Sequence, residues 1–387
     1  MSVTSAAGFR ASGVRAGIRS RGERPDVALV VNDGPRQVAA GVFTSNQVKA
    51  APVLWSQQVL TQHRLRAVVL NAGGANACTG SDGFVDTHHT AEKVADVLGC
   101  GAIEVAVCST GLIGERLPMP SLLAGVDDAA AALADGADAG TAAATAVLTT
   151  DTVDKQAART HEQGFTVGGF AKGAGMMAPS LATMLVVITT DADLDAEAAD
   201  AALRAATATT FDRLDVDGST STNDTVLLLA SGASGVTPDA DAFAGELTAV
   251  CAELCRGMQA DAEGVTKRIV VTVSAARDDA DALVAARAIA RDSLVKTALF
   301  GSDPNWGRIA AAVGGSDAVV DPQSLDVTVN GVLLCRGATA VGDRAAADLT
   351  GPDVTVEVAL GLGEGSATVL TTDLSHAYVE ENSAYSS

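Results

Sequence analysis

Residues 172–186 read Lys172-Gly-Ala-Gly-Met-Met-Ala-Pro-Ser-Leu-Ala-Thr-Met-Leu-Val186, a glycine-rich loop with one lysine ahead of an apolar run. The run from Thr183 to Ile188, bounded by this loop, predicts a buried strand. A threonine hydroxyl is a poor nucleophile inside a chain, but at a chain start its own α-amine can take the hydroxyl proton. Thr183 would gain that amine only if the Ala182–Thr183 bond is cut.

Two details of the loop favour such a cleavage. Ala182 is small and leaves its carbonyl approachable, and Gly173 and Gly175 allow the backbone angles of a strained turn. The new α-amine would have a pKa of roughly 7.7–8.0, so much of it would be free base near neutral pH. The alternative interpretation is a loop that only leads into a strand.

The composition limits the function classes. The chain has 387 residues, of which 48% are hydrophobic, enough for one large or two medium domains. Its formal net charge of −21 argues against nucleic acid as a partner, because phosphate binding needs a basic face. A small anionic substrate stays compatible, since a few local lysines or arginines suffice.

The sequence also bears on location and redox state. We expect no membrane span, since no long uninterrupted apolar window occurs. The six cysteines include no Cys-x-x-Cys pair, so we expect reduced thiols and a cytoplasmic location. Cys251 and Cys255 lie on one expected helix, where we expect core packing rather than a metal pair. An arginine-rich start could indicate a transit peptide, but it lacks an amphipathic period.

Seven blocks in a fixed order resemble the glutamate N-acetyltransferase (ornithine acetyltransferase) family of arginine biosynthesis. The resemblance covers essentially the whole chain, and several long blocks are more specific than one short motif. The blocks are Asn71-Ala-Gly-Gly-Ala-Asn-Ala-Cys78, Cys108-Ser-Thr-Gly-Leu-Ile-Gly114, Thr149-Thr-Asp151, the block from Lys172 to Leu185, Asp261-Ala-Glu-Gly-Val-Thr-Lys267, Gly301-Ser-Asp-Pro-Asn-Trp-Gly-Arg308 and Glu381-Asn-Ser-Ala-Tyr-Ser-Ser387.

The resemblance implies a self-cleaving acetyltransferase with Thr183 as its nucleophile. Cleavage at Ala182–Thr183 would give an alpha chain, 1–182, and a beta chain, 183–387, which would associate as a heterotetramer of two each. Thr183 would carry the acetyl group from N-acetylornithine to glutamate in a ping-pong reaction without cofactor or metal. Whether acetyl-CoA is a second donor, which would make the enzyme bifunctional, is left open.

The resemblance also assigns residues to roles. It gives Thr110 and Gly111 to the oxyanion hole, where acyl transfer needs donors for the developing negative charge. The residues that it gives to substrate binding are Thr149, Lys172, Thr183, Glu263, Asn382 and Ser387. Without it, Thr110-Gly111 would be an ordinary strand-end turn, Glu263 a helix-end acid, and Asn382 and Ser387 part of a disordered tail.

Hydrophobic periodicity predicts an α/β (α+β layered) fold, and the resemblance implies an N-terminal-nucleophile-like sandwich of mixed sheets flanked by helices. We expect strands at 26–31, 39–43, 65–70, 104–108, 183–189, 225–229 and 268–273. Glycines at 164 and 168–169 predict a hairpin before the lysine loop, and further hairpins are expected at 327–334 and 354–371. Helices are expected at 87–98, 121–134, 141–148, 195–209, 243–258 and 280–294.

Several other motifs fail on their context. Ser293-Leu-Val-Lys296 lacks the companion signatures of Ser-x-x-Lys enzymes, and Asp215-Val-Asp217-Gly218 has Arg213 at the first ligand position of a calcium loop. The dense Gly, Asn and Asp blocks 71–78 and 301–308 predict tight turns that form a scaffold. Two rival functions stay open: a self-cleaving threonine aminopeptidase or amidohydrolase, and a non-enzymatic binding module with Thr183 uncut.

Overall fold

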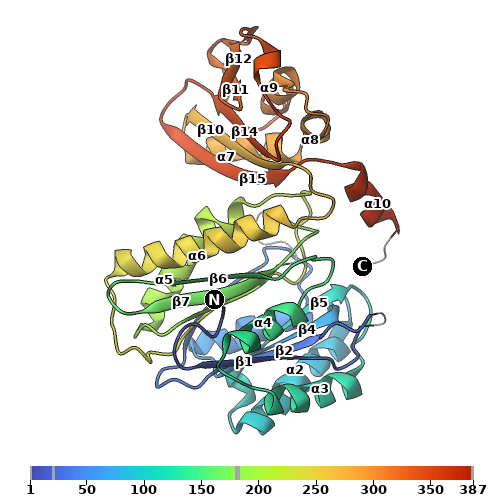
Figure 1. Cartoon of the computed structure of the whole chain (residues 1–387), viewed down its shortest axis with the longest axis vertical. Coiled ribbons are helices and arrows are strands. Elements are labelled where there is room, and N and C mark those ends of the chain that lie inside the picture. The colour runs from blue at the N-terminus through green and yellow to red at the C-terminus, as the bar shows by residue number, and fades with distance from the viewer. Residues whose placement is uncertain (1, 20–21, 179–183, 385–387) are drawn as a thin grey trace. The chain divides into compact units, whose positions relative to one another are not determined.

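The computed structural model describes residues 2–19, 22–178 and 184–384. The chain forms two units (Figure 1). Unit 1 contains the residues up to Asp212 together with Ser219–Met258, and unit 2 contains Arg213–Gly218 together with the residues from Gln259 onward.

The first sheet of unit 1 has four strands in the order β1-β2-β4-β5. β4 and β5 are parallel, whereas β1 and β2 join antiparallel. β2 reads Val-Ala-Leu-Val-Val-Asn and is buried along its whole length, as expected for a strand covered on both faces. Helices α1 to α4 pack against this sheet. The elements are β1 (Phe9–Val14), β2 (Val27–Asn32), α1 (Ala51–Val59), β4 (Ala67–Gly74), α2 (Gly80–Leu98), β5 (Val105–Leu112), α3 (Met119–Ala131) and α4 (Ala137–Ala146).

The second sheet of unit 1 has five strands in the order β3-β9-β8-β7-β6. Apolar side chains from both sheets join one core cluster, so the two sheets form a sandwich. Helices α5 and α6 lie over the other face of the second sheet (Figure 1). The elements are β3 (Val38–Phe43), β6 (Lys155–Thr160), β7 (Thr166–Lys172), β8 (Leu185–Thr190), α5 (Ala196–Thr209), β9 (Thr225–Ala230) and α6 (Ala240–Ala260).

Unit 2 is built on a six-stranded sheet in the order β13-β12-β11-β14-β10-β15. Buried and exposed residues alternate along β14, so one face of the sheet packs on a core and the other faces solvent. Helix α7 covers the buried face of β10 and β15. The elements are β10 (Arg268–Ala276), α7 (Asp279–Arg291), α8 (Ser293–Phe300), α9 (Trp306–Gly314), β11 (Asp326–Val329), β12 (Val332–Arg336), β13 (Thr339–Ala340), β14 (Asp353–Ala359), β15 (Gly365–Thr372) and α10 (His376–Ala384).

Short 3-10 helices complete the described elements: η1 (Leu60–Gln62), η2 (Ala102–Glu104), η3 (Phe211–Arg213), η4 (Pro322–Ser324) and η5 (Arg344–Ala346). The mixed α/β layers predicted from periodicity are confirmed. Cys251 and Cys255 are both buried on α6, as expected for core packing. No helix of the described residues is long and apolar enough to cross a bilayer.

Three expected elements differ from the structure. The runs at 354–360 and 367–371 are strands but not a hairpin, because β10 lies between β14 and β15 and pairs with both. The expected helix at 280–294 is split, because Asp292 is extended and its side chain caps the start of α8. The block 301–308 is only partly a turn, since Asn305 caps α9 and Trp306 begins that helix.

Candidate functional site

The end of β5 carries the expected oxyanion residues, Thr110 and Gly111. Thr110 is fully buried, and among the described residues its hydroxyl Oγ1 has no hydrogen-bond partner. Gly111 has φ of +131°, and a Cβ there would lie 2.6 Å from the backbone of Gly73 and Gly74. Only glycine fits this turn, where β4 and β5 change register. A buried donor without an acceptor fits a group that awaits a ligand oxygen.

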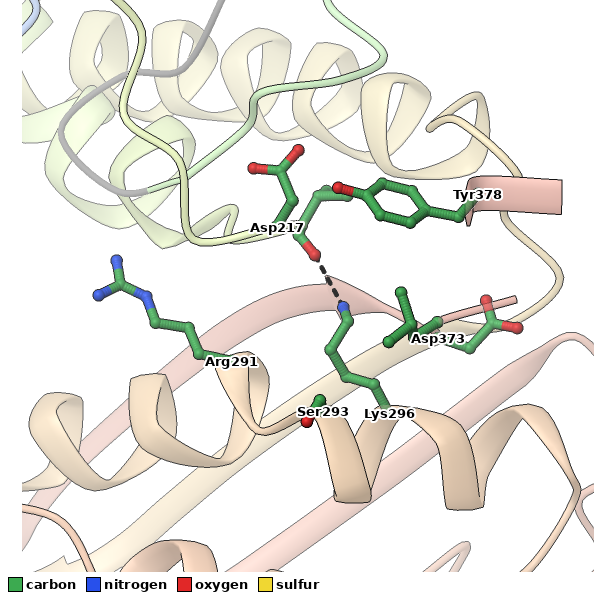
Figure 2. A pocket seen from close by; sticks show the side chains of 8 residues that line it. Asp217, Arg291, Ser293, Lys296, Asp373 and Tyr378 are labelled. Carbon is green, nitrogen blue, oxygen red and sulfur yellow. Dashed lines mark hydrogen bonds between the residues drawn. The ribbon is translucent and has the colours of Figure 1, made fainter. Parts of the chain in front are cut away.

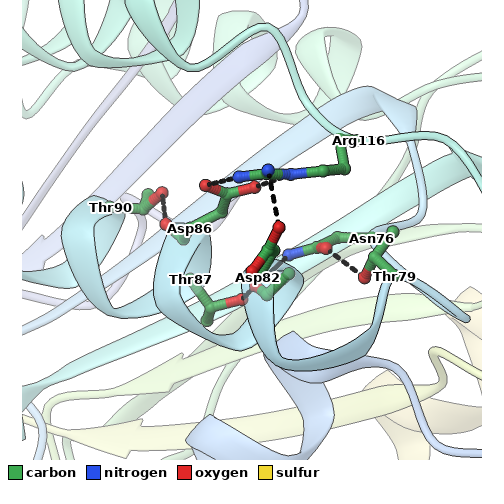
Figure 3. Close-up of polar contacts among 8 residues, drawn as sticks. Asn76, Thr79, Asp82, Asp86, Thr87, Thr90 and Arg116 are labelled. Carbon is green, nitrogen blue, oxygen red and sulfur yellow. Dashed lines mark hydrogen bonds and ion pairs between the residues drawn. The ribbon is translucent and has the colours of Figure 1, made fainter.

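A polar network holds the loops on either side of this strand end (Figure 3). Arg116, which follows β5, donates from Nε and Nη2 to the Asp86 carboxylate at 2.9 and 2.7 Å. Asn76, which follows β4, donates to the carbonyl of Gly83 and to Thr87 Oγ1 at 2.8 and 2.9 Å. Asn76 and Arg116 thus tie both loops to helix α2. The block 71–78, for which we predicted tight turns, is only partly a turn, since its residues up to Gly74 belong to β4.

Lys172 is the last residue of β7 and is buried, with only 2% of its surface exposed. Its Nζ lies 4.0 Å from Oδ2 of Asp151, which has no exposed side-chain surface. Asp151 also accepts from Lys155 Nζ at 2.6 Å and from the Gly173 amide at 2.8 Å. The Thr149 amide donates to the same carboxylate at 3.1 Å, so the structure brings Thr149 and Lys172 together around Asp151.

The charges around Asp151 keep its carboxyl group ionised. Burial by itself raises the pKa of Asp151, but the charges of Lys172 and Lys155 outweigh it and lower the pKa to about 2. The carboxylate therefore stays ionised, and one negative charge is shared by two ammonium groups. The cluster thus holds two lysine side chains at one buried carboxylate.

Asn223 precedes β9 of the second sheet and is hydrogen-bonded to residues of the first sheet and the loop after it. Its side-chain amide donates to the carbonyls of Ala75 and Ser109 at 2.6 and 2.8 Å. The Ser109 carbonyl belongs to the same peptide group as the Thr110 amide, so this bond fixes the backbone that leads into Thr110. The sequence reasoning missed Asn223 and its neighbour Asp224. The available signal was two polar residues directly before β9, a strand that is buried along its whole length.

Two further predicted residues lie in unit 2. Asn382 on α10 donates to Glu263 Oε2 at 2.9 Å and to the Tyr378 carbonyl at 3.0 Å. Part of the expected tail is thus a helix that is bonded to Glu263. Ala182, Thr183 and Ser387 lie outside the described residues.

Unit 2 also contains a cavity of about 180 Å³ beside Lys296 (Figure 2). The Lys296 amine donates to the Val216 carbonyl at 2.7 Å, to Thr371 Oγ1 at 3.1 Å and to the Thr372 carbonyl. An ammonium group has three donors, and these bonds use all three. Lys296 therefore supports the fold, in keeping with our rejection of the Ser293-to-Lys296 motif.

The other rejected motif also has a structural role. Asp215 is buried and accepts from Arg291 Nε at 2.6 Å and from the Gly218 amide at 3.1 Å. Among the described residues, no group of three or more His, Cys, Asp or Glu side chains is arranged to hold a metal ion.

Comparisons with known proteins identify relatives over the whole chain. The ArgJ family matches residues 10–387. A protein of Mycolicibacterium paratuberculosis named arginine biosynthesis bifunctional protein ArgJ is 62% identical over 390 residues, covering 100% of this chain and 96% of its own. The protein of the same name from Thermobifida fusca is 60% identical over 387 residues, with 100% of both chains covered.

Two solved structures match about half of the chain each. Ornithine acetyltransferase of Mycobacterium tuberculosis, complexed with ornithine, is 63% identical and covers 47% of this chain and 96% of that chain, with a TM-score of 0.46. The arginine biosynthesis bifunctional protein argJ of Bacillus halodurans is 35% identical and covers 51% of this chain and 97% of that chain, with a TM-score of 0.49.

Proposed function

This chain belongs to the ArgJ family, and on that premise we propose that Thr183, freed by cleavage of the Ala182–Thr183 bond, is its acetyl-carrying nucleophile. The protein is an acetyltransferase of arginine biosynthesis. The observation that carries the assignment is the buried, unpartnered hydroxyl of Thr110 in the same unit as the positively charged cluster around Lys172. Acyl transfer needs both an oxyanion donor and a group that holds the substrate.

Cleavage and transfer use the same hydroxyl in this scheme. The Thr183 hydroxyl attacks the Ala182 carbonyl and displaces its own nitrogen, which takes a proton and becomes the new α-amine. Water then hydrolyses the ester that joins Ala182 to the Thr183 oxygen, which ends the covalent link between the alpha and beta chains. In the mature enzyme the same oxygen takes the acetyl group from N-acetylornithine, and ornithine leaves. The glutamate amine then attacks the acetyl ester to give N-acetylglutamate and the free hydroxyl.

Substrate recognition must accept two side chains of opposite charge. Ornithine ends in a cation and glutamate in an anion, so recognition should concentrate on the α-carboxylate and α-nitrogen that they share. Lys172 is the natural partner of the α-carboxylate, because an ammonium group can form a charge-assisted bond with it. The other substrate-binding residues that we propose are Thr149, Glu263, Asn382 and Ser387.

Two features of the reaction go with this assignment. The relatives are named bifunctional, so we include acetyl-CoA as a second acetyl donor to glutamate. No cofactor or metal takes part in the scheme.

The two proposed fragments share one sheet. Strands β3, β6 and β7 precede Thr183, whereas β8 and β9 follow it, and β8 pairs directly with β7. Six residue pairs, from Val167–Thr190 to Lys172–Leu185, join those two strands. Cleavage would therefore leave the alpha chain, 1–182, and the beta chain, 183–387, held together. We propose that they assemble as a cytoplasmic heterotetramer of two each.

Intact mass of the purified protein tests the cleavage. At 38.7 kDa for 387 residues, fragments of 182 and 205 residues should weigh roughly 18 and 20 kDa, with the nucleophile at the start of the larger one. They should co-elute, and Thr183→Ala should stay whole and inactive. A wild-type chain that is active while uncut contradicts the scheme. Acetate in place of N-acetylglutamate would indicate the amidohydrolase instead.

The oxyanion role has its own matched pair of variants. Thr110→Val keeps the shape of the side chain and removes its hydroxyl, whereas Thr110→Ser keeps the hydroxyl. Because Oγ1 has no partner in the described protein, Thr110→Val should not lower stability, yet kcat should fall about 10²–10³-fold. Thr110→Ser should retain most of the rate. Equal rates in the two variants would remove the hydroxyl from the mechanism.

A further inference from the structure

The side chain of Asp224 is hydrogen-bonded to Met184, which lies between Thr183 and the first residue of strand β8. Its Oδ1 accepts from the backbone nitrogen of Met184 at 2.9 Å, and that nitrogen is bonded to the carbonyl carbon of Thr183. The Met184 carbonyl in turn accepts from the Thr225 amide at 3.0 Å. Met184 is therefore fixed on both sides by the residues that begin β9.

The same carboxyl group has an unused oxygen. Asp224 has no exposed surface, and among the described residues its Oδ2 has no hydrogen-bond partner. Burial raises the pKa of Asp224 well above its usual range, while the Met184 amide, the Lys172 charge and the Ser221 hydroxyl act against that rise. A buried polar atom without a partner is costly, so its retention points to a use outside the packing of the fold.

Its neighbour Asn223 links this point to the oxyanion residues. The Asn223 amide holds the Ser109 carbonyl at 2.8 Å, on the peptide group that leads into Thr110. Two consecutive residues therefore hold two parts of the proposed site. Asn223 bonds to Ser109 of β5, and Asp224 bonds to Met184, the residue after Thr183.

We propose that Asp224 is a positioning residue of the acyl-transfer site, which fixes the chain at Met184 through Oδ1 and presents Oδ2 to a polar group of the nucleophile or substrate. This inference rests on the proposed function of Thr183.

Asp191 provides a matched comparison at the other end of β8. It is also buried, but both of its oxygens are used, Oδ1 by the Thr166 amide at 2.7 Å and Oδ2 by the Ala7 amide at 3.0 Å. These bonds account fully for the carboxylate as a structural group. Asp224 differs in having one oxygen that no such bond explains.

The test compares Asp224→Asn with Asp191→Asn in the full-length protein. An asparagine at 224 can keep its oxygen on the Met184 amide and replaces only Oδ2 by an NH₂ group. We expect Asp224→Asn to keep the thermal midpoint of wild type, with kcat lowered about 10²-fold and KM unchanged, the size of effect that a slight misplacement of reacting groups produces. Asp191→Asn should lower the thermal midpoint and leave kcat unchanged, because it breaks a backbone bond away from the reaction.

Intact mass recorded beside the kinetics separates the outcomes. A folded Asp224→Asn chain that stays uncut supports the proposal, because the chemistry at Thr183 is lost while the fold remains. A variant that is cut and has the kcat of wild type overturns it, as does a loss of activity that only follows a loss of folded protein. If Asp224→Asn does not fold, Asp224→Ser carries the test, since it also removes the carboxyl group; a lowered kcat of the folded protein supports the proposal and an unchanged kcat contradicts it.

The role of Asp224 and the proposed function of Thr183 can fail separately. Wild type that is cut and gains one acetyl group on the beta chain, beside an unimpaired Asp224→Asn, overturns only the role of Asp224. Wild type that is never cut or acetylated overturns the proposed function and this inference together.

Discussion

The two units neutralise their buried lysines in different ways. In unit 1, Lys155 and Lys172 share the carboxylate of Asp151. In unit 2, Lys296 donates to carbonyl and hydroxyl oxygens, and Lys267 donates to the carbonyls of Leu349 and Gly351 at 2.6 and 2.9 Å. Both arrangements satisfy donors, but only the first brings a formal countercharge into direct contact.

The difference agrees with the roles that we propose, substrate binding for Lys172 and support of the fold for Lys296. A buried charge is costly unless it is paired and hydrogen-bonded. Carbonyl oxygens can satisfy the three donors of Lys296, but burial still lowers its pKa to about 8, although Asp215, Asp217 and Asp373 raise it. The cluster of unit 1 instead places both lysines beside the ionised carboxylate of Asp151, whose pKa they lower to about 2. A lysine ammonium in such a cluster is a group that can form a charge-assisted bond with a substrate carboxylate.

The largest effect should come from removing the shared carboxylate. Asp151→Asn would leave Lys155 and Lys172 buried without their countercharge, and breaking a buried pair in this way typically costs about 3–5 kcal/mol. Urea unfolding would measure the loss. Asp353→Asn is the control, because its partner Arg268 is a surface residue and such pairs contribute little. A loss no larger than that of the control would mean that the cluster does not depend on Asp151.

The next effect concerns substrate binding, where only the lysine of unit 1 should matter. Lys172→Met keeps bulk and removes charge, so both half-reactions should weaken together, each by about 1.5–3 kcal/mol for a lost charge-assisted bond. Lys296→Met makes the same chemical change in unit 2 and should leave kcat/KM unchanged. The measurement is the rate of acetyl-enzyme formation from N-acetylornithine and of its reaction with glutamate.

The kinetic pattern sharpens the same prediction. Transfer through an acetyl-threonine gives parallel double-reciprocal lines at several glutamate concentrations. A loss of rate confined to one half-reaction would mean that Lys172 contacts the side chain of one substrate and not the α-carboxylate that both share. Intersecting lines without an acetylated fragment would indicate direct transfer between two bound substrates and exclude Thr183 as nucleophile.

The sequence predicts local elements well and their partners less well. The buried runs that became β8 and β9 were recognised because every residue in them is apolar or a threonine, with glycine or polar residues before them. The error at β14 and β15 arose because a short glycine-rich connection suggests a hairpin, whereas β10, far back in the chain, is inserted between them. Periodicity carries no information on which distant strand intervenes.

The site shows the same limit. Lys172 and Thr149 were found through resemblance, but Asp151 was quoted only as part of a block. Nothing in one sequence indicates that a carboxylate at 151 meets an amine twenty-one residues later across a strand edge. Asn223 and Asp224 were missed because their importance comes from contacts with Ser109 and Met184, which lie in other parts of the chain.

The smallest effect that separates the two units is the dependence of the free energy of unfolding on pH. The pKa of Asp151 in the folded state is about 2, below its ordinary value, so the unfolded chain binds the proton more readily. The stability that this group contributes is present above the ordinary value, near pH 4, and is lost as the pH falls toward 2. Lys296 also has a lowered pKa, about 8 against an ordinary 10.5, so its charged form is disfavoured by folding.

For Lys296 the slope of stability against pH has the same sign as for Asp151, but it falls in the alkaline range. Between pH 8 and about 10.5 the unfolded chain holds the Lys296 proton and the folded chain releases it, so stability contributed by this residue rises with pH. Urea unfolding of wild type and Lys296→Met across this range should therefore show a rising contribution that only the lysine supplies. The same comparison with Asp151→Asn between pH 4 and 2 should show an acid loss that the variant lacks. Equal slopes in wild type and Lys296→Met would mean that its oxygen partners hold the charged amine as well as water does, and the contrast between the two units would then rest on Asp151 alone.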